Sequence, residues 1–243
     1  MKVIAIIPAA GLGTRMASAL GGKSKKQGAS KQFTELAGTP ILIHTLRRFL
    51  SNPEIAEIYV ALRANEMEGF EKRLEATKDL RSEKIRIVEG GEHRQQSVGN
   101  AIARISAAPD DIILVHDAVR PFVTETIIQE VIRAAQKYGA AIAGMPAVDT
   151  VKQVERTSDG ALITATVPRE RVVMAQTPQG FCYEVLKRAF DEATADGFLG
   201  TDEASLVERS GHKVAVVMGS PRNIKITTPA DLELAEFYLK VAS

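Results

Sequence analysis

The sequence predicts an α/β fold in which helices flank both faces of a mainly parallel β-sheet. Short apolar runs rich in valine and isoleucine alternate with longer segments of helical period, the pattern of strands joined by helical crossovers. The runs are continuously apolar, as expected for strands that are buried on both faces. Because no internal repeat or long low-complexity segment appears, residues 1–243 are expected to form a single domain.

The expected elements follow one another from the N-terminus. The predicted strands are Val3–Ile7, Ile58–Ala61, Ile85–Val88, Ile112–Val115, Ala140–Gly144 and Val214–Met218. The predicted helices are Pro40–Leu50, Glu66–Thr77, Gln95–Ile105, Thr124–Tyr138, Tyr183–Ala193 and Asp202–Ser210. Thr124 and Thr201 are expected to be helix N-caps, because each hydroxyl can accept a backbone N–H and each residue is followed by an acid.

Residues 149–172 depart from this alternation. Two β-type runs, Thr150–Val154 and Leu162–Val167, surround a polar SDG turn and predict a β-hairpin. The residues by themselves leave open whether the hairpin packs locally or extends as an arm onto a partner.

The composition argues against several classes of protein. With 31 Lys and Arg against 30 Asp and Glu, the net charge of +1 disfavours a protein that coats nucleic acid. The single cysteine, Cys182, excludes an internal disulfide and a cysteine-based zinc site, which suits a reducing compartment. The apolar run Val3–Ile7 is far shorter than the roughly 20 residues that cross a bilayer, so we expect a cytoplasmic protein without a membrane segment.

A glycine turn follows the first predicted strand. Val3–Ile7 runs directly into PAAGLGTRM, and ligands of open α/β sheets bind at such carboxyl ends. Glycines let backbone N–H groups approach a phosphate, although the same residues can form a simple tight turn. Met16 stands where a dinucleotide fingerprint needs its third glycine, which disfavours an NAD-dependent dehydrogenase.

Cations gather around this turn. The first acid of the chain is Glu35, and the cations that precede it are Lys2, Arg15, Lys23, Lys25, Lys26 and Lys31. A run of one sign beside a glycine turn favours a polyphosphate ligand, with a solvated basic loop as the alternative. GGKS is not a P-loop, because Ala17 stands where G-x-x-x-x-G-K-S needs glycine.

Polar residues also follow later strands. In GGEHRQQSV at 90–98, a carboxylate, an arginine and a hydroxyl could read a base or a sugar, while Glu92 and Arg94 could equally form a solvated pair. Further along, the cations and hydroxyls that suggest a second anionic ligand are Arg169, Thr177 and Lys225.

The segment VHDAVRP at 115–121 places an acid and an arginine directly after the fourth predicted strand. Asp117 could bind a metal or a ribose, or form a structural pair with Arg120, because a carboxylate at the end of a buried strand needs a partner. His116 is expected to be a packed histidine rather than a catalyst.

Several motifs occur in a familiar order: PAAGLGTRM, a downstream KQ, GGEHRQQSV, VHDAVRP, a DT pair followed by K, QTPQGF, TDEAS and NIKITTPADL. Over nearly the entire chain this order resembles the 2-C-methyl-D-erythritol 4-phosphate cytidylyltransferases. HDAVRPF and NIKITTP are also similar to the ribitol-5-phosphate cytidylyltransferases. The initial PAAG, Lys152 after the DT pair, and TDEAS favour the methylerythritol family.

The resemblance implies a Rossmann-like, mainly parallel sheet with a protruding β-hairpin arm. It also implies transfer of CMP from CTP to a polyol phosphate with Mg²⁺, releasing pyrophosphate. Because two anionic phosphates must approach each other, positioned cations and Mg²⁺ would lower the barrier, and an ionised phosphate needs no general base. The alternative from another class is a catalytically silent CTP-binding protein, against which the intact Arg15 and Lys31 count.

The resemblance also implies a role for each matching residue, and it leaves the metal ligands unassigned. Arg15 and Lys31 match the catalytic cations that hold the triphosphate. The nucleotide is matched by Pro8, Ala9, Ala10, Gly11, Gly13, Gly91, Glu92, Ser97, Asp117 and Ala118, with aspartate frequent in relatives where Glu92 stands. The polyol phosphate is matched by Asp117, Arg120, Thr150, Arg169, Thr177 and Lys225.

Two further implications concern the hairpin and the basic loop. In the family, the hairpin at 149–172 crosses to a second subunit, which implies a homodimer in which Arg169 serves the partner's site. The family usually has P-K-Q soon after the R-M pair, whereas here Ser30 precedes Lys31 after a longer loop with other lysines. This departure leaves open which lysine is catalytic, and the loop itself is expected to be a lid over the triphosphate.

Overall fold

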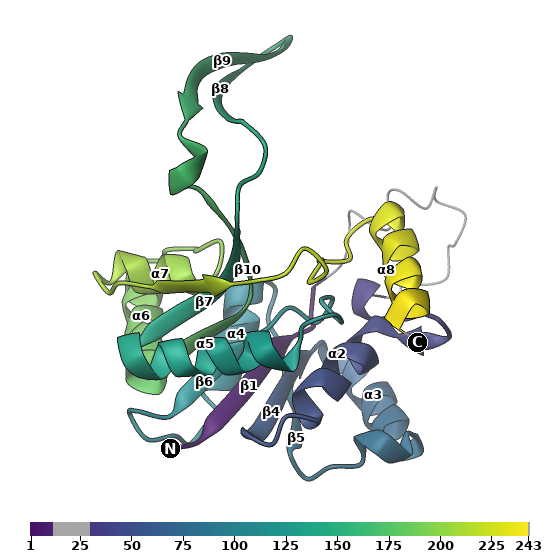
Figure 1. Ribbon diagram of the computed structural model, residues 1–243. Coiled ribbons are helices and arrows are strands. Elements are labelled where there is room, and N and C mark those ends of the chain that lie inside the picture. The colour runs from purple at the N-terminus through teal and green to yellow at the C-terminus, as the bar shows by residue number, and fades with distance from the viewer. Residues whose placement is uncertain (12–29, 243) are drawn as a thin grey trace.

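The computed structural model describes residues 1–11 and 30–242, which build a layered α/β fold around one sheet (Figure 1). The strands of this sheet are β1 (Val3–Pro8), β4 (Ile55–Leu62), β5 (Ile85–Glu89), β6 (Ile112–Val115), β7 (Ala140–Pro146), β10 (Val173–Cys182) and β11 (Ala215–Met218). Their order is β11-β7-β10-β6-β1-β4-β5, and all pair in parallel except β10, which runs antiparallel to both neighbours. The mainly parallel sheet is therefore confirmed.

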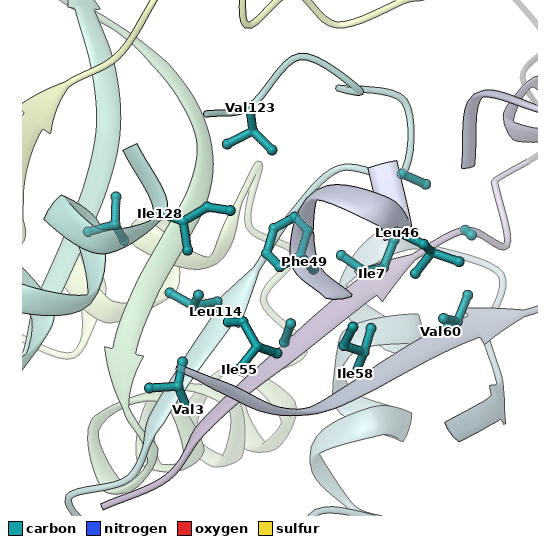
Figure 2. Close-up of a cluster of buried hydrophobic side chains, with 14 of the residues drawn as sticks. Val3, Ile7, Leu46, Phe49, Ile55, Ile58, Val60, Leu114, Val123 and Ile128 are labelled. Carbon is teal, nitrogen blue, oxygen red and sulfur yellow. The ribbon is translucent and has the colours of Figure 1, made fainter. Parts of the chain in front are cut away.

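Helices cover both faces of the sheet. The helices are α2 (Ile41–Leu50), α3 (Ala64–Ala76), α4 (Arg94–Ile102), α5 (Glu125–Tyr138), α6 (Tyr183–Ala195), α7 (Glu203–Arg209) and α8 (Pro229–Ala242). On one face α2, α3 and α5 pack a core that includes Phe49, Leu114 and Ile128 (Figure 2). On the other face α4, α6 and α7 pack a second core. No helix among the described residues is long and apolar enough to span a membrane.

Strand β1 explains why the apolar runs are continuous. Its residues Val3, Ala5 and Ile7 belong to the first core, whereas Ile4 and Ile6 belong to the second. Successive side chains of a strand point to opposite faces, so a strand buried on both faces is apolar at every position.

The two largest elements that were not predicted from the sequence are β10 and α8. Strand β10 contains Gln176, Thr177 and Gln179, whose polarity hides its strand character. The C-terminal helix α8 carries a small core of its own with Leu36 and Val119, which lie far from it in the chain. The short strands β2 (Glu35–Leu36) and β3 (Thr39–Pro40) pair with each other, and the 3₁₀ turns are η1 (Lys31–Phe33), η2 (Lys78–Leu80) and η3 (Arg169–Arg171).

One of the two predicted caps is confirmed and the other is wrong. The hydroxyl of Thr124 accepts the N–H of Ile127 at 3.3 Å at the start of α5. At α7 the N-cap is Asp202 rather than Thr201. The carboxylate of Asp202 accepts the N–H of Ser205 at 2.9 Å, and the Ser205 hydroxyl accepts the N–H of Asp202 at 3.4 Å. This reciprocal capping box satisfies two backbone donors, whereas a threonine contact would satisfy one.

The predicted hairpin is formed by β8 (Val151–Thr157) and β9 (Gly160–Val167), which pair with each other. It projects away from the body of the molecule (Figure 1), and its side chains are exposed along almost its whole length. Leu162 and Ile163 near its tip are each 65% exposed. The hairpin is therefore a protruding arm, as the resemblance implied, and not a locally packed element.

Candidate active site

A cavity of about 210 Å³ lies at the carboxyl ends of the central parallel strands. It brings together most of the predicted site residues: Pro8, Ala9, Ala10, Gly11, Lys31, Gly91, Glu92, Ser97, Asp117, Ala118 and Lys225. A larger groove of about 1140 Å³ runs along the edge strand β5, but it contains none of them. The smaller cavity is the candidate active site.

The glycine turn after β1 is held against its neighbours. The N–H of Ala9 donates to the carbonyl of Ala61 at 2.8 Å. The side-chain amide of Gln32, which is fully buried, donates to the carbonyl of Ala9. Because Gln32 follows Lys31 in η1, this contact brings Lys31 to the same edge of the cavity as the turn. Gly13, Arg15 and the expected lid lie outside the described residues.

The segment before α4 approaches the glycine turn closely. The N–H of Gly91 donates to the hydroxyl of Ser97 at 3.0 Å, and that hydroxyl donates to the carbonyl of His93. A Cβ added to Gly90 would lie 2.5 Å from the Cβ of Ala10, which only glycine avoids. The backbone of both segments is thus exposed to one shared cavity, while the Glu92 side chain remains at its outer rim.

Asp117 is surrounded by cations at the floor of the cavity. Its carboxylate lies 3.3 Å from Nε of Arg94, 3.2 Å from Nε of Arg120 and 3.0 Å from Nζ of Lys225. Burial by itself would raise the pKa of Asp117, but the three cations outweigh it and hold that pKa well below its usual range. The Asp117–Arg120 pair is therefore present, as one part of a larger charge cluster.

Glu203 completes the cluster from behind. This side chain is 1% exposed, and both of its oxygens accept from Nη1 of Arg94, at 2.6 and 2.7 Å. Burial raises the pKa of Glu203, and the charge of Arg94 opposes that rise. Three cations and two carboxylates leave an excess of one positive charge at the cavity floor, an arrangement that favours an anionic ligand.

A chain of hydrogen bonds fixes the backbone of this floor. The N–H of Asp117 donates to Oγ1 of Thr177 at 3.0 Å, and the Thr177 hydroxyl lies 3.1 Å from Nδ1 of His116. Nε2 of His116 lies 3.0 Å from the carbonyl of Arg120. Burial lowers the pKa of His116 to about 4, so the ring is neutral and each nitrogen has one partner. His116 is a packed histidine, as predicted.

Two predicted residues lie apart from the cavity of their own chain. Thr150 and Arg169 are both exposed at the base of the arm. Nη1 of Arg169 donates to the carbonyl of Val148 at 2.9 Å, and its Nε lies 3.8 Å from Glu170. The structure therefore does not bring these two side chains to the residues that line the cavity.

Sequence reasoning missed several residues that shape the site. Arg94 was considered as a solvated partner of Glu92, but it pairs with Asp117 and Glu203 instead. Gln179 links β10 to α7, because its amide donates to Asp202 at 2.7 Å and its oxygen accepts from Ala204. The motif TDEAS marked the position of Glu203, but its partner Arg94 lies 109 residues away in the chain.

A parallel α/β sheet with a glycine turn beside a cationic floor is the architecture of an enzyme that handles a nucleotide, and the fold and site define a nucleotidyltransferase. The family model described as IspD, 2-C-methyl-D-erythritol 4-phosphate cytidylyltransferase, matches residues 3–241. The chain belongs to this family.

Individual relatives carry the same description. A protein of Acidobacterium capsulatum named 2-C-methyl-D-erythritol 4-phosphate cytidylyltransferase is 56% identical, over 100% of this chain and 99% of its own length. A protein of Solibacter usitatus with the same name is 51% identical over 99% of this chain and 96% of its own. The crystal structure of the Thermus thermophilus protein of that name is similar with a TM-score of 0.75 and 32% identity, covering 99% of this chain and 100% of that one.

Proposed function

We infer that this chain transfers CMP from CTP to 2-C-methyl-D-erythritol 4-phosphate. The products are 4-diphosphocytidyl-2-C-methyl-D-erythritol, an intermediate of isoprenoid precursor synthesis by the non-mevalonate route, and pyrophosphate. Membership of the family over residues 3–241 carries this inference. The cluster around Asp117 supports it, because a cavity floor with excess positive charge suits two phosphate ligands that must meet.

The reaction requires that like charges approach each other. An oxygen of the acceptor phosphate attacks the α-phosphorus of CTP, a new P–O bond forms, and the bond to the β-phosphate breaks as pyrophosphate leaves. Lys31 at the cavity edge and Arg15 are assigned to the triphosphate, where they stabilise the negative charge of the transition state. Lys225 and Arg120, both held by Asp117, are assigned to the acceptor phosphate.

The nucleoside is assigned to the opposite wall. The backbone of Ala10 and Gly11 is assigned to the nucleotide, and Gly90 lets the segment before α4 lie close against it. Ser97 and Glu92 are assigned to the cytosine, and Ala118 with Asp117 to the ribose. All these residues line one cavity, which supports placing the base and the ribose side by side.

Mg²⁺ is proposed as the cofactor, with CTP as co-substrate. Among the described residues, no group of three or more His, Cys, Asp or Glu side chains could hold a metal by itself. Mg²⁺ commonly takes one or two carboxylates together with substrate phosphates, and the ionised carboxylate of Asp117 fits that role. Bound there, the ion would neutralise phosphate charge, while the protein cations orient the two phosphates.

The active form is proposed to be a cytoplasmic homodimer of single-domain subunits. The arm at 149–172 projects with exposed Leu162 and Ile163, which a second subunit would cover. Thr150 and Arg169 at the base of the arm lie apart from the cavity of their own chain, so they are assigned to the partner's acceptor site.

The test is a direct assay of the purified protein with CTP and Mg²⁺. We expect pyrophosphate release with methylerythritol 4-phosphate and at most a minor rate with ribitol 5-phosphate. A faster rate with ribitol 5-phosphate would change the assigned acceptor. CTP binding by calorimetry without turnover on either acceptor would indicate a catalytically silent protein instead.

A further inference from the structure

The start of α3 contacts the chain on both sides of residues 12–29, at Ala10 and at Ser30. Arg63, directly before α3, donates from Nε to the carbonyl of Ala10 at 2.9 Å. In the first turn of the helix, a carboxylate oxygen of Glu66 accepts from the hydroxyl of Ser30. Ala10 precedes Gly11 of the glycine turn, and Ser30 precedes Lys31. One helix start therefore contacts both nucleotide-facing segments.

This helix start is firmly attached to the core. The N–H of Glu66 donates to the carbonyl of Arg63 at 2.9 Å, and Phe70 one turn further on is 2% exposed. The ring of Phe70 also lies 5.9 Å from that of Phe33, which closes the 3₁₀ turn that begins at Lys31. The turn that carries Lys31 is therefore attached to α3 on two sides, by the Ser30 hydroxyl and by the Phe33 ring.

Ser30 is a buried polar residue with a defined backbone. Its side chain and backbone are 1% exposed, and its carbonyl accepts the N–H of Phe33 at 2.8 Å. Its φ of −59° and ψ of 141° set the direction in which Lys31 leaves the preceding chain. These angles lie in the ordinary extended region, and the side-chain contact with Glu66 ties the residue that adopts them to α3.

Two atoms of this helix start are buried without a hydrogen-bond partner among the described residues: Nη2 of Arg63 and Oε2 of Glu66. Leaving a buried donor and a buried acceptor unpaired is costly, so each such atom in a folded protein needs an explanation. Helix stability by itself offers none, because both side chains direct their remaining contacts away from α3, at Ala10 and Ser30.

We propose that Glu66 and Arg63 are positioning residues for nucleotidyl transfer. Glu66 sets Lys31 through Ser30, and Arg63 sets the glycine turn through the carbonyl of Ala10. Neither lines the cavity, so both act through the residues that do. The proposal rests on the proposed function, in which Lys31 and the glycine turn bind the triphosphate.

The first experiment is a double-mutant cycle on the Ser30–Glu66 contact, read out as pyrophosphate release. Glu66→Ala and Ser30→Ala are each expected to lower kcat by roughly 10- to 100-fold, the scale of a misplaced catalytic group. The double variant is expected to be no worse than either single variant. The matched control is Glu68→Ala, which removes an exposed carboxylate of the same helix that pairs with Lys72.

A second variant separates positioning from a general loss of structure. Proline fixes φ near −65°, close to the −59° of Ser30, so Ser30→Pro can supply the same backbone geometry without a hydroxyl. Adding Ser30→Pro to Glu66→Ala is expected to restore most of kcat. Thermal unfolding should show that every variant is folded at the temperature of the assay.

Three results would show that Glu66 does not position Lys31 through Ser30. Independent, multiplying losses in the cycle, a Glu66→Ala variant as active as Glu68→Ala, or no rescue by proline would each overturn the proposal. Failure of the proposed function is read separately, as a wild-type protein that releases no pyrophosphate. In that case the Kd for CTP is measured by calorimetry for the variants of the Ser30–Glu66 cycle and for Arg63→Gln. Coupling between Ser30 and Glu66 and weaker binding by Arg63→Gln are then expected, and their absence would overturn the positioning role.

Discussion

Arg94 donates from a single nitrogen, Nη1, to both oxygens of Glu203, while its Nε donates to Asp117 at 3.3 Å. Arg94 thus connects the first turn of α7 to the floor of the cavity. Burial opposes the charge of Arg94, but Glu203 and Asp117 outweigh it and raise the pKa of Arg94 above its usual range. The orientation of Asp117 therefore depends, through Arg94, on Glu203, a buried residue that does not line the cavity.

Replacing Glu203 with glutamine is expected to impair both stability and catalysis. The change leaves the half-buried Arg94 with one carboxylate partner, and breaking a pair with a buried carboxylate costs about 3 kcal/mol of unfolding free energy. Denaturant unfolding and kcat/KM for the acceptor measure the two effects. Glu208→Gln, an exposed position on the same helix, is the control. Equal behaviour of the two variants would contradict a role for Glu203.

Acid is expected to destabilise the fold through His116. The folded chain binds a proton there only near pH 4, whereas the unfolded chain does so near pH 6.5. The unfolded state thus binds more protons within this window, and the free energy of unfolding should fall as pH drops from 6.5 to 4, by about 3 kcal/mol in total. Above pH 6.5 the contribution of His116 to the free energy of unfolding is complete.

Denaturant titrations across this pH window measure the slope. His116→Gln should flatten it, whatever the stability of the variant at pH 7. His44 adds to the slope with the same sign, because burial also lowers its pKa, so His44→Gln is the comparison. A slope unchanged by His116→Gln would show that the acid sensitivity arises elsewhere.

Lys31→Ala is expected to lower turnover by at least ~100-fold, the scale of losing one electrostatic contact to the transition state. Steady-state release of pyrophosphate measures this effect. Lys26→Ala is the comparison from the same basic segment and should retain much more activity, although Lys26 lies outside the described residues. A near-normal Lys31→Ala with an inactive Lys26→Ala would assign the catalytic role to Lys26.

The arm is expected to complete the site of a partner subunit. Arg169→Ala and Lys225→Ala should each be nearly inactive, since each removes one acceptor contact. When the two variants are unfolded together and refolded, half of the dimers should be mixed, and one of their two sites keeps both residues. About a quarter of wild-type activity should then return. Sedimentation measures the dimer, and no recovery in a mixed dimer would place Arg169 in the site of its own chain.

The parallel sheet could be predicted because its strands are buried on both faces and so are continuously apolar. Strand β10 could not, because Gln176, Thr177 and Gln179 interrupt its apolar pattern. Thr177 bonds to residues 116–117, Gln179 to the start of α7 and its N-cap, and Gln176 to residues 220 and 223, partners that come together only after folding. The cap at α7 was misplaced by one residue because both Thr201 and Asp202 are good caps by type.

By itself, the sequence determined the fold class, the strand-end positions of the site and the family, because these depend on local periodicity and on motifs a few residues long. The tertiary structure decided which charges meet. Arg94 could pair with its neighbour Glu92 or with the distant Glu203, and burial of Glu203 selects the latter, since a buried carboxylate requires a partner whereas an exposed one has water. The same physics places Ser30 against Glu66, a contact between residues 36 positions apart in the chain.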